Sequence, residues 1–279
     1  MMIIDSQVHI WAPETAEKPY AKENVSTPHR DVPLGYEELL REMDGAGVER
    51  CILVPPTWED DRNDTSLEAA RLHPDRFRVM GRISISKPES RALVATWKNQ
   101  PHMLGIRLVF NPGRTASWLI DGTADWLWDA AERYDVAVMA FAPNLVPKLG
   151  EIAERHPGLR MIIDHMGLSS ALRGKSLEPA IADLIKMARL KNVAVKVSAL
   201  PCYVDEAYPF PTLHPLVRRV VDAFGPQRCF WGTDRSHLPC PYKQAVTLFS
   251  EEMTQLSANE LEWIMGRGLG EWLHWPLPG

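Results

Sequence analysis

Short runs of apolar and β-branched residues alternate along the chain with longer stretches in which apolar residues recur every three to four positions. The short runs predict eight strands, at 2–10, 51–56, 78–84, 103–110, 136–142, 160–166, 192–199 and 228–234. The stretches between them predict helices at 36–47, 66–73, 89–97, 124–134, 144–156, 179–190 and 215–225, and a helical segment follows from Tyr242 to Trp275. Glycine and proline end several of these helices shortly before the next strand, as in Asp44-Gly45 and His156-Pro157.

This order of elements indicates how the chain folds. Eight strands alternating with helices favour a parallel sheet, and eight such strands close naturally into an α/β fold of the (β/α)8 TIM-barrel type. An open doubly wound sheet is the alternative, but it usually carries a glycine-rich phosphate loop after a strand. Gly266 to Gly270 lies instead within a helical pattern near the C-terminus. We therefore expect one barrel domain over residues 1–279.

Composition and charge narrow the classes of partner. The 279-residue chain is 45% hydrophobic and has a formal charge of -5. This mild acidity and the lack of a dense Lys/Arg cluster argue against nucleic acid and against a polybasic membrane surface. No apolar run approaches the length of a membrane span, and the four cysteines form no C-x-x-C pair. We expect a reduced, cytoplasmic protein whose partner is a small molecule.

Polar residues gather where the predicted strands end, which is where a barrel places its catalytic groups. These residues are Gln7, His9, Arg107, His165, Lys196, Ser198 and Asp234. Side chains alternate along a strand, so Lys196 and Ser198 face the barrel interior if the three valines at 193, 195 and 197 face the helices. Burial of a lysine, a histidine and a carboxylate at one end of the barrel costs free energy of folding, so their convergence there indicates a functional site.

Each residue also has a purely structural interpretation. A lone histidine on a strand, such as His9, is more often a hydrogen-bonded core residue, but its company with His165 and Asp234 favours a functional role. Lys196 and Arg107 could each form a structural ion pair, or could contact substrate. An inward arginine near the barrel mouth suits a substrate carboxylate in a bidentate contact.

Four motifs carry a resemblance to a known family. Gln7-x-His9 on the first strand, IIDHMG at 162–167, VAVKVSAL at 193–200 and FWGTD at 230–234 resemble, in this order, the amidohydrolase superfamily. They are most similar to its amidohydrolase-related branch, which includes sugar lactonases, pyrone-dicarboxylate lactonase and related decarboxylases. The resemblance places His9, His165 and Asp234 on metal-ligand or catalytic positions. It assigns to Asp234 the role of orienting or deprotonating the attacking water. Position 7 departs from the pattern, which has histidine there.

The chemistry of a lactonase is consistent with these residues. Hydrolysis of an ester or lactone needs activated water, a stabilised oxyanion and a proton for the leaving oxygen. Asp234 suits the base, and His165, Lys196 or a cation near His9 could polarise the carbonyl. With water as a fourth ligand, His9, His165 and Asp234 could hold a zinc ion. Gln7 would be a weak ligand there, or it would bind substrate in a metal-free site. The sequence thus predicts one weakly bound divalent metal, or none.

Long segments follow several of the predicted strands, and long loops in a compact domain are usually functional or mobile. They contribute predicted substrate contacts, which are Trp58, Tyr203 and Arg235, in addition to Gln7, Arg107 and Lys196. Further candidates in these loops are Arg62, Arg114, Tyr208 and His237. Several cations near one mouth favour a small, carboxylated substrate.

Three functions remain open from the sequence. The first is a hydrolase that opens a small, carboxylated lactone or cyclic ester by attack of activated water, with an aspartate base. The second is a metal-dependent decarboxylase, a lyase with the same barrel. The third is a catalytically silent barrel that binds a small molecule.

Overall fold

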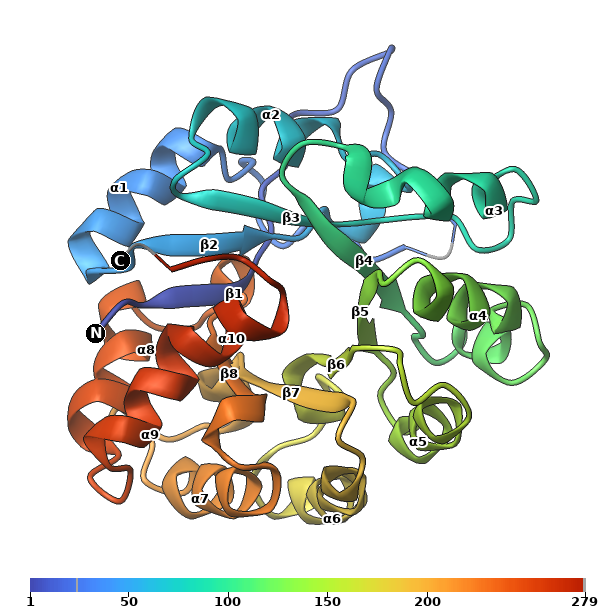
Figure 1. The fold of residues 1–279 in the computed structure, drawn as a ribbon. Helices are drawn as coiled ribbons and strands as arrows, with labels where there is room; N and C mark the ends of the chain where they lie inside the picture. The colour runs from blue at the N-terminus through green and yellow to red at the C-terminus, as the bar shows by residue number, and fades with distance from the viewer. Residues whose placement is uncertain (24, 278–279) are drawn as a thin grey trace.

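The computed structural model of the chain describes residues 1–23 and 25–277. Its sheet has eight strands in the order of the sequence, and each is parallel to the next (Figure 1). The strands are β1 (Ile4–Val8), β2 (Arg50–Leu53), β3 (Phe77–Gly81), β4 (Met103–Val109), β5 (Ala137–Phe141), β6 (Met161–Ile163), β7 (Val193–Ser198) and β8 (Cys229–Gly232). The predicted (β/α)8 barrel, with all eight strands, is confirmed.

Helices surround the strands, and most of those predicted are present. They are α1 (Tyr36–Ala46), α2 (Asp64–Leu72), α3 (Ser90–Leu93), α4 (Asp125–Arg133), α5 (Val146–Arg155), α6 (Glu178–Lys186), α7 (Leu213–Phe224), α8 (Tyr242–Thr247), α9 (Ala258–Glu262) and α10 (Gly268–Trp272). The predicted helix at 89–97 is instead a short α-helix that continues as a 3-10 helix, Val94–Asn99. In the described part of the chain no helix combines the length and the apolar character needed to span a membrane.

Contacts at the ends of β1 and β8 bring the two edges of the sheet together. The main-chain N–H of Asp234 donates to the carbonyl of Gln7 over 2.9 Å. The buried carboxylate of Asp5 accepts hydrogen bonds from the main-chain N–H groups of Gln7 and Thr233, each over 3.0 Å, and from the Tyr242 hydroxyl over 2.6 Å. These bonds fix the main chain at the ends of β1 and β8, and they thereby fix the positions of Gln7 and Asp234 relative to each other.

The alternation predicted for the seventh strand is confirmed. Val193, Val195 and Val197 pack with the helices in the larger hydrophobic cluster, whereas Ala194 belongs to the cluster inside the barrel. Trp275, beyond α10, also packs with this inner cluster. The C-terminal segment returns to the strands near the N-terminus of the chain (Figure 1).

Candidate active site

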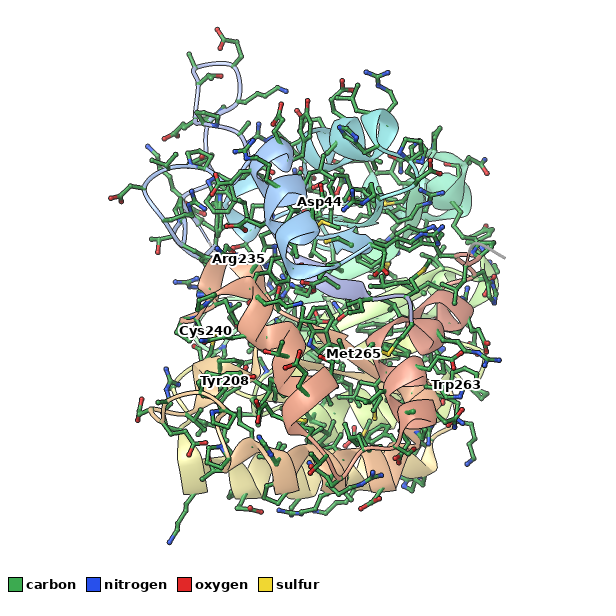
Figure 2. All side chains as sticks on the ribbon, turned by 90° about the vertical axis from the view of Figure 1, so that its left-hand side faces the viewer. Asp44, Tyr208, Arg235, Cys240, Trp263 and Met265 are labelled. Carbon is green, nitrogen blue, oxygen red and sulfur yellow. The ribbon has the colours of Figure 1, made fainter. Side chains whose placement is uncertain are left out.

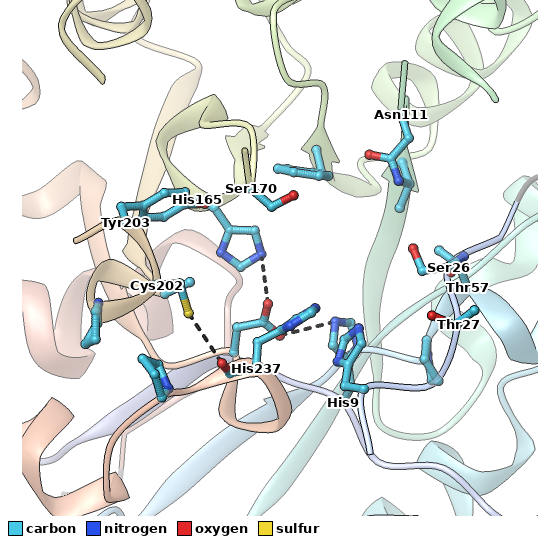
Figure 3. A pocket seen from close by; sticks show the side chains of 18 of the residues that line it. His9, Ser26, Thr27, Thr57, Asn111, His165, Ser170, Cys202, Tyr203 and His237 are labelled. Carbon is cyan, nitrogen blue, oxygen red and sulfur yellow. Dashed lines mark hydrogen bonds and ion pairs between the residues drawn. The ribbon is translucent and has the colours of Figure 1, made fainter. Parts of the chain in front are cut away.

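A cavity of about 580 Å³ lies at the C-terminal ends of the strands. Figure 3 shows histidines from distant parts of the chain meeting in it. Seven of the residues named from the sequence line this cavity, namely His9, Trp58, Arg107, His165, Tyr203 and Asp234, and the further loop candidate His237. The cavity is where function is expected in a barrel, because loops from all strands converge on this face.

Three consecutive strands end in an uncommon backbone conformation. His165, Ala199 and Asp234 follow β6, β7 and β8, and their φ angles are 50°, 57° and 53°. Left-handed φ values in residues other than glycine cost roughly 1–3 kcal/mol each and cluster at functional sites. The turn at His165 also explains why β6 ends at Ile163, earlier than the sequence predicts.

The Asp234 carboxylate lies between the imidazole rings of His9 and His165. Its Oδ1 is 3.4 Å from Nε2 of His9, and its Oδ2 is 3.7 Å from Nε2 of His165. Oδ1 is buried and has no hydrogen-bond partner among residues 1–23 and 25–277. Burial alone would raise the pKa of Asp234, but in the acid range where this carboxyl titrates the neighbouring histidines are protonated, and their positive charge holds its pKa well below its usual range. The carboxylate is therefore ionised at neutral pH.

Two hydrogen bonds define the state of His9. Its Nδ1 is 2.6 Å from the Val54 carbonyl oxygen, which can only accept, so Nδ1 carries the proton. Burial lowers the pKa of His9 to about 3, and the ring is neutral at pH 7. Its Nε2 lone pair then accepts a hydrogen bond from the Gln7 side-chain amide over 3.2 Å.

A buried row of polar side chains under the cavity orients Gln7. Lys196 Nζ is 2.6 Å from Gln7 Oε1 and 2.8 Å from Asp164 Oδ1. Arg107 Nε donates to the other Asp164 oxygen over 3.1 Å. An ammonium can only donate, so the Gln7 oxygen must face Lys196 and its NH2 group must face His9. Burial opposes the charge of Asp164, but Lys196 and Arg107 lower the pKa of its carboxyl.

This arrangement bears directly on the predicted metal ligands. A zinc ion on His9 would need the Nε2 lone pair that the Gln7 amide occupies. Across residues 1–23 and 25–277, no three His, Cys, Asp or Glu side chains are grouped closely enough to hold a metal. His9, His165 and Asp234 as they stand therefore do not fit a tightly bound zinc ion.

His165 has a different set of contacts. Its Nδ1 is 2.8 Å from the Ser198 hydroxyl, and the Phe141 ring packs edge-on against it with centroids 5.5 Å apart. Burial lowers the pKa of His165 to about 4, so it is also neutral at pH 7. If Ser198 donates to Nδ1, the proton of the ring is on Nε2, directed toward Asp234 and the cavity.

Two further histidines line the cavity and come from loops. The rings of His29 and His237 are in contact, with centroids 3.4 Å apart and planes tilted by 36°, and His29 Nδ1 lies 2.7 Å from the Ser236 hydroxyl. Burial lowers the pKa of His29 to about 4. His237 is on the loop after β8 and is among the further loop candidates, but nothing in the sequence indicates that His29 contacts it.

Three predicted substrate contacts lie outside the cavity lining. Gln7 and Lys196 are buried beneath it, held by each other and by Asp164. Arg235 turns away to α1, where it makes a bidentate ion pair with Glu42 over 2.8 and 2.6 Å (Figure 2). No residue spacing could have indicated a pairing across 193 positions. None of the three borders the cavity in this arrangement.

Sequence reasoning missed several residues of the site. Asp164 directly precedes His165 at a strand end, which was a usable signal, whereas Phe141 looks like an ordinary apolar strand residue. The other missed lining residues come from loops or turns, among them Ser26, Asn111, Ser170 and Arg173.

Comparisons with known proteins agree with the resemblance of the motifs. The family model described as amidohydrolase matches residues 4–267. The chain is 30% identical to an L-fucono-1,5-lactonase of Burkholderia ambifaria over 237 residues, which are 83% of the chain and 79% of the relative. It is 28% identical to a 4-sulfomuconolactone hydrolase of Hydrogenophaga intermedia over 84% of the chain and 74% of that relative.

Solved structures show the same fold. An amidohydrolase from Burkholderia multivorans with bound zinc superimposes with a TM-score of 0.82 at 22% identity, covering 99% of this chain and 100% of the other. A probable 2-pyrone-4,6-dicarboxylic acid hydrolase from Acinetobacter baumannii, with citric acid bound, gives a TM-score of 0.81 at 18% identity and the same coverage. At these identities the likeness concerns the barrel alone.

Proposed function

Because the chain belongs to the amidohydrolase family, we propose that it is a lactonase that opens the ring of a small, carboxylated lactone. The observation that carries this proposal is the buried Asp234 carboxylate, which lies between two neutral histidines and whose Oδ1 has no partner in the described chain. The names of the two relatives, a fuconolactonase and a sulfomuconolactone hydrolase, support the same class of reaction.

The first step is the attack of water. A water molecule donates one hydrogen bond to Asp234 Oδ1, and the ionised carboxylate takes its proton as the oxygen attacks the lactone carbonyl carbon. His9 offers no N–H to this carboxylate, because its proton is on Nδ1 and is bonded to Val54. Its neutral ring next to Oδ1 leaves the carboxylate free to bind the water.

The negative charge that develops on the carbonyl oxygen needs a donor. When the Ser198 hydroxyl donates to Nδ1, the Nε2–H of His165 points into the cavity and can stabilise this oxyanion. When the tetrahedral intermediate collapses, the bond to the ring oxygen breaks, and Asp234 returns its proton to that oxygen. The products are a free carboxylic acid and a hydroxyl on one open chain.

Arg107 would hold the carboxylate of the substrate. Its Nε is bonded to Asp164, while its side chain lines the cavity and lies over the Phe141 ring. The two terminal nitrogens can then form a bidentate contact with a carboxylate. The decarboxylase alternative depends on a metal, and the contact between Gln7 and His9 gives it no support. Nor does a silent binding protein account for three strained strand ends at one cavity.

A turnover screen tests the proposal. Sugar 1,4- and 1,5-lactones and carboxylated pyrones are supplied at pH 7.5, and ring opening is followed by proton release. We expect at least one lactone to be hydrolysed well above the buffer rate.

Asp234→Asn should lower kcat by about 10²- to 10⁴-fold while the protein stays folded. Asp129→Asn, on the exposed side of α4, is the matched control. No hydrolysis of any lactone, or an Asp234→Asn enzyme with more than about a tenth of wild-type turnover, would refute the proposal.

A further inference from the structure

A second cavity, of about 460 Å³, adjoins the first. Arg107 and Val109, at the end of β4, line both cavities. The rest of its wall comes from the loop after β1, including Lys22 and Glu23, from Asp60 after β2, from the segment after β3, including Arg82, Ser84 and Lys87, and from Thr115 and Trp118 after β4. The proposed reaction uses no residue on the far side of Arg107, so this space has no role yet.

The Arg82 guanidinium in this wall is held but not neutralised. Asn63 fixes its main chain, with Oδ1 accepting from the Arg82 N–H over 2.7 Å and Nδ2 donating to the Arg82 carbonyl over 2.9 Å. Its Nε donates to the Asp60 carbonyl oxygen over 2.6 Å. Its Nη1 is buried and has no hydrogen-bond partner within residues 1–23 and 25–277, and no carboxylate of those residues is within ion-pair distance of Arg82.

Asp60 and Asp61 lie close enough to raise the pKa of Arg82, but neither forms an ion pair with it. Lys87 pairs with Asp61 over 2.9 Å and also approaches Asp60 at 3.6 Å, so those carboxylates are already engaged. Arg107 is balanced by Asp164 beneath the first cavity. Burial, and then the nearby Arg107, lower the pKa of Arg82 to about 10, which still leaves it charged at pH 7. A buried charge without a partner is costly, and an incoming anion would relieve that cost.

We propose that the second cavity is a subsite for an anionic arm of the substrate, a carboxylate, sulfonate or phosphate that binds Arg82 while the lactone ring occupies the first cavity. The inference rests on the proposed function and names a second anionic group on its substrate. Arg107, on the shared wall, holds the group next to the ring, and Arg82 holds the distal group. The hydroxyl of Ser84 is a further polar group of the same wall, whereas the Thr115 hydroxyl already donates to the Val109 carbonyl.

Binding of inorganic phosphate tests the subsite without turnover. By calorimetry, we expect Arg82→Met to weaken phosphate binding at least about tenfold, which corresponds to about 1.4 kcal/mol. Arg82→Lys, which keeps the charge, should lose less. Arg71→Met, on the exposed side of α2 where Arg71 pairs with Glu68, is the matched control and should bind as the wild type does. Equal phosphate affinity in Arg82→Met and the wild type would overturn the subsite.

Kinetics then test the assignment to the substrate. Two lactones that differ only in a distal carboxylate or its methyl ester are compared, with melting temperatures measured for every variant. Arg82→Met should lower kcat/KM for the acid about tenfold or more and leave the ester unchanged. Ser84→Asp, which adds a carboxylate to the same wall, should act in the same direction if Arg82→Met folds poorly. Equal losses for acid and ester would overturn the proposal.

A separate anion, not attached to the substrate, is the rival occupant. Phosphate should compete with the acid lactone and not with the ester if the arm and phosphate share Arg82. Phosphate that binds at Arg82 but does not compete would overturn the assignment to a substrate arm. If no lactone is hydrolysed at all, the proposed function fails, and the phosphate titration still decides whether the subsite exists.

Discussion

Lys196 donates a hydrogen bond from Nζ to the Gln7 Oε1 atom over 2.6 Å, and this contact determines what Gln7 offers to the active site. With its oxygen held by the ammonium, Gln7 presents its NH2 group to Nε2 of His9. The position where the family pattern has a metal-binding histidine therefore supplies a hydrogen-bond donor. Lys196 lies beneath the site, where burial lowers its pKa and the Asp164 carboxylate, 2.8 Å away, favours its charged form.

Gln7→His tests whether this contact excludes a metal. An imidazole at position 7 offers a lone pair, and Nε2 of His9 is no longer occupied by the amide. We expect the variant to bind about one zinc ion per chain without an increase in kcat, while wild-type activity largely survives treatment with a chelator. Metal content is measured by elemental analysis, with Gln255→His, at an exposed position, as the control. Loss of wild-type activity with chelator, and full recovery with zinc, would contradict the metal-free interpretation.

Lys196→Met should destabilise the fold strongly. Lys196 and Asp164 are both fully buried and 2.8 Å apart, so the substitution leaves a buried carboxylate with only Arg107 opposite it. Removal of one partner of a buried ion pair typically costs about 3–5 kcal/mol. Lys186→Met, which breaks an exposed pair with Asp183, should cost less than about 1 kcal/mol. Urea unfolding compares the two, and a similar loss for both would show that the buried pair contributes little.

The sequence predicts those parts of the site that depend on strand periodicity. The inward direction of Lys196 and Ser198, and the convergence of His9, His165 and Asp234, follow from alternation and from parallel strands ending at one face. Alternation gives the direction of a side chain but not its depth. It could not show that Lys196 lies beneath the cavity floor, because this depends on the contact with Gln7, 189 positions away.

Loop residues could not be placed from the sequence, because no period governs them. Arg235 was expected at the cavity, yet its nearest carboxylate is Glu42 on α1. His29, from the segment after β1, packs against His237 after β8. Both outcomes depend on tertiary packing, which a local pattern does not record.

Arg107→Met should change the recognition of substrate. The methionine keeps most of the buried volume of the side chain but removes the fork that would hold a carboxylate. We expect KM for a carboxylated lactone to rise at least about tenfold, and far more than for the ester at the same carboxylate. Arg107→Lys, which keeps the charge but not the fork, should retain only part of the preference of the wild type for the carboxylated lactone over the ester. Similar losses for acid and ester would mean that Arg107 acts through its bond to Asp164 and does not contact the substrate.

The buried histidines should make the fold sensitive to acid. Burial lowers the pKa of His9 to about 3 and that of His165 and His29 to about 4, whereas a histidine in an unfolded chain titrates near 6.5. As the pH falls below about 6.5, the unfolded chain binds protons that the folded chain does not. The free energy of unfolding therefore decreases, by up to about 1.4 kcal/mol per pH unit for each histidine, until the pH reaches the folded-state values.

We expect the melting temperature at constant ionic strength to fall steadily from pH 6.5 to pH 4.5 and to change little between pH 7 and pH 8. His165→Gln removes one of the three groups, so its melting temperature should depend less steeply on pH across the acid range. His274→Gln, at an exposed position near the C-terminus, serves as the control and should keep the wild-type slope. A His165→Gln protein whose slope equals that of the wild type would show that His165 is not held neutral by burial. The neutral His165 donor in the proposed reaction would then have to be abandoned.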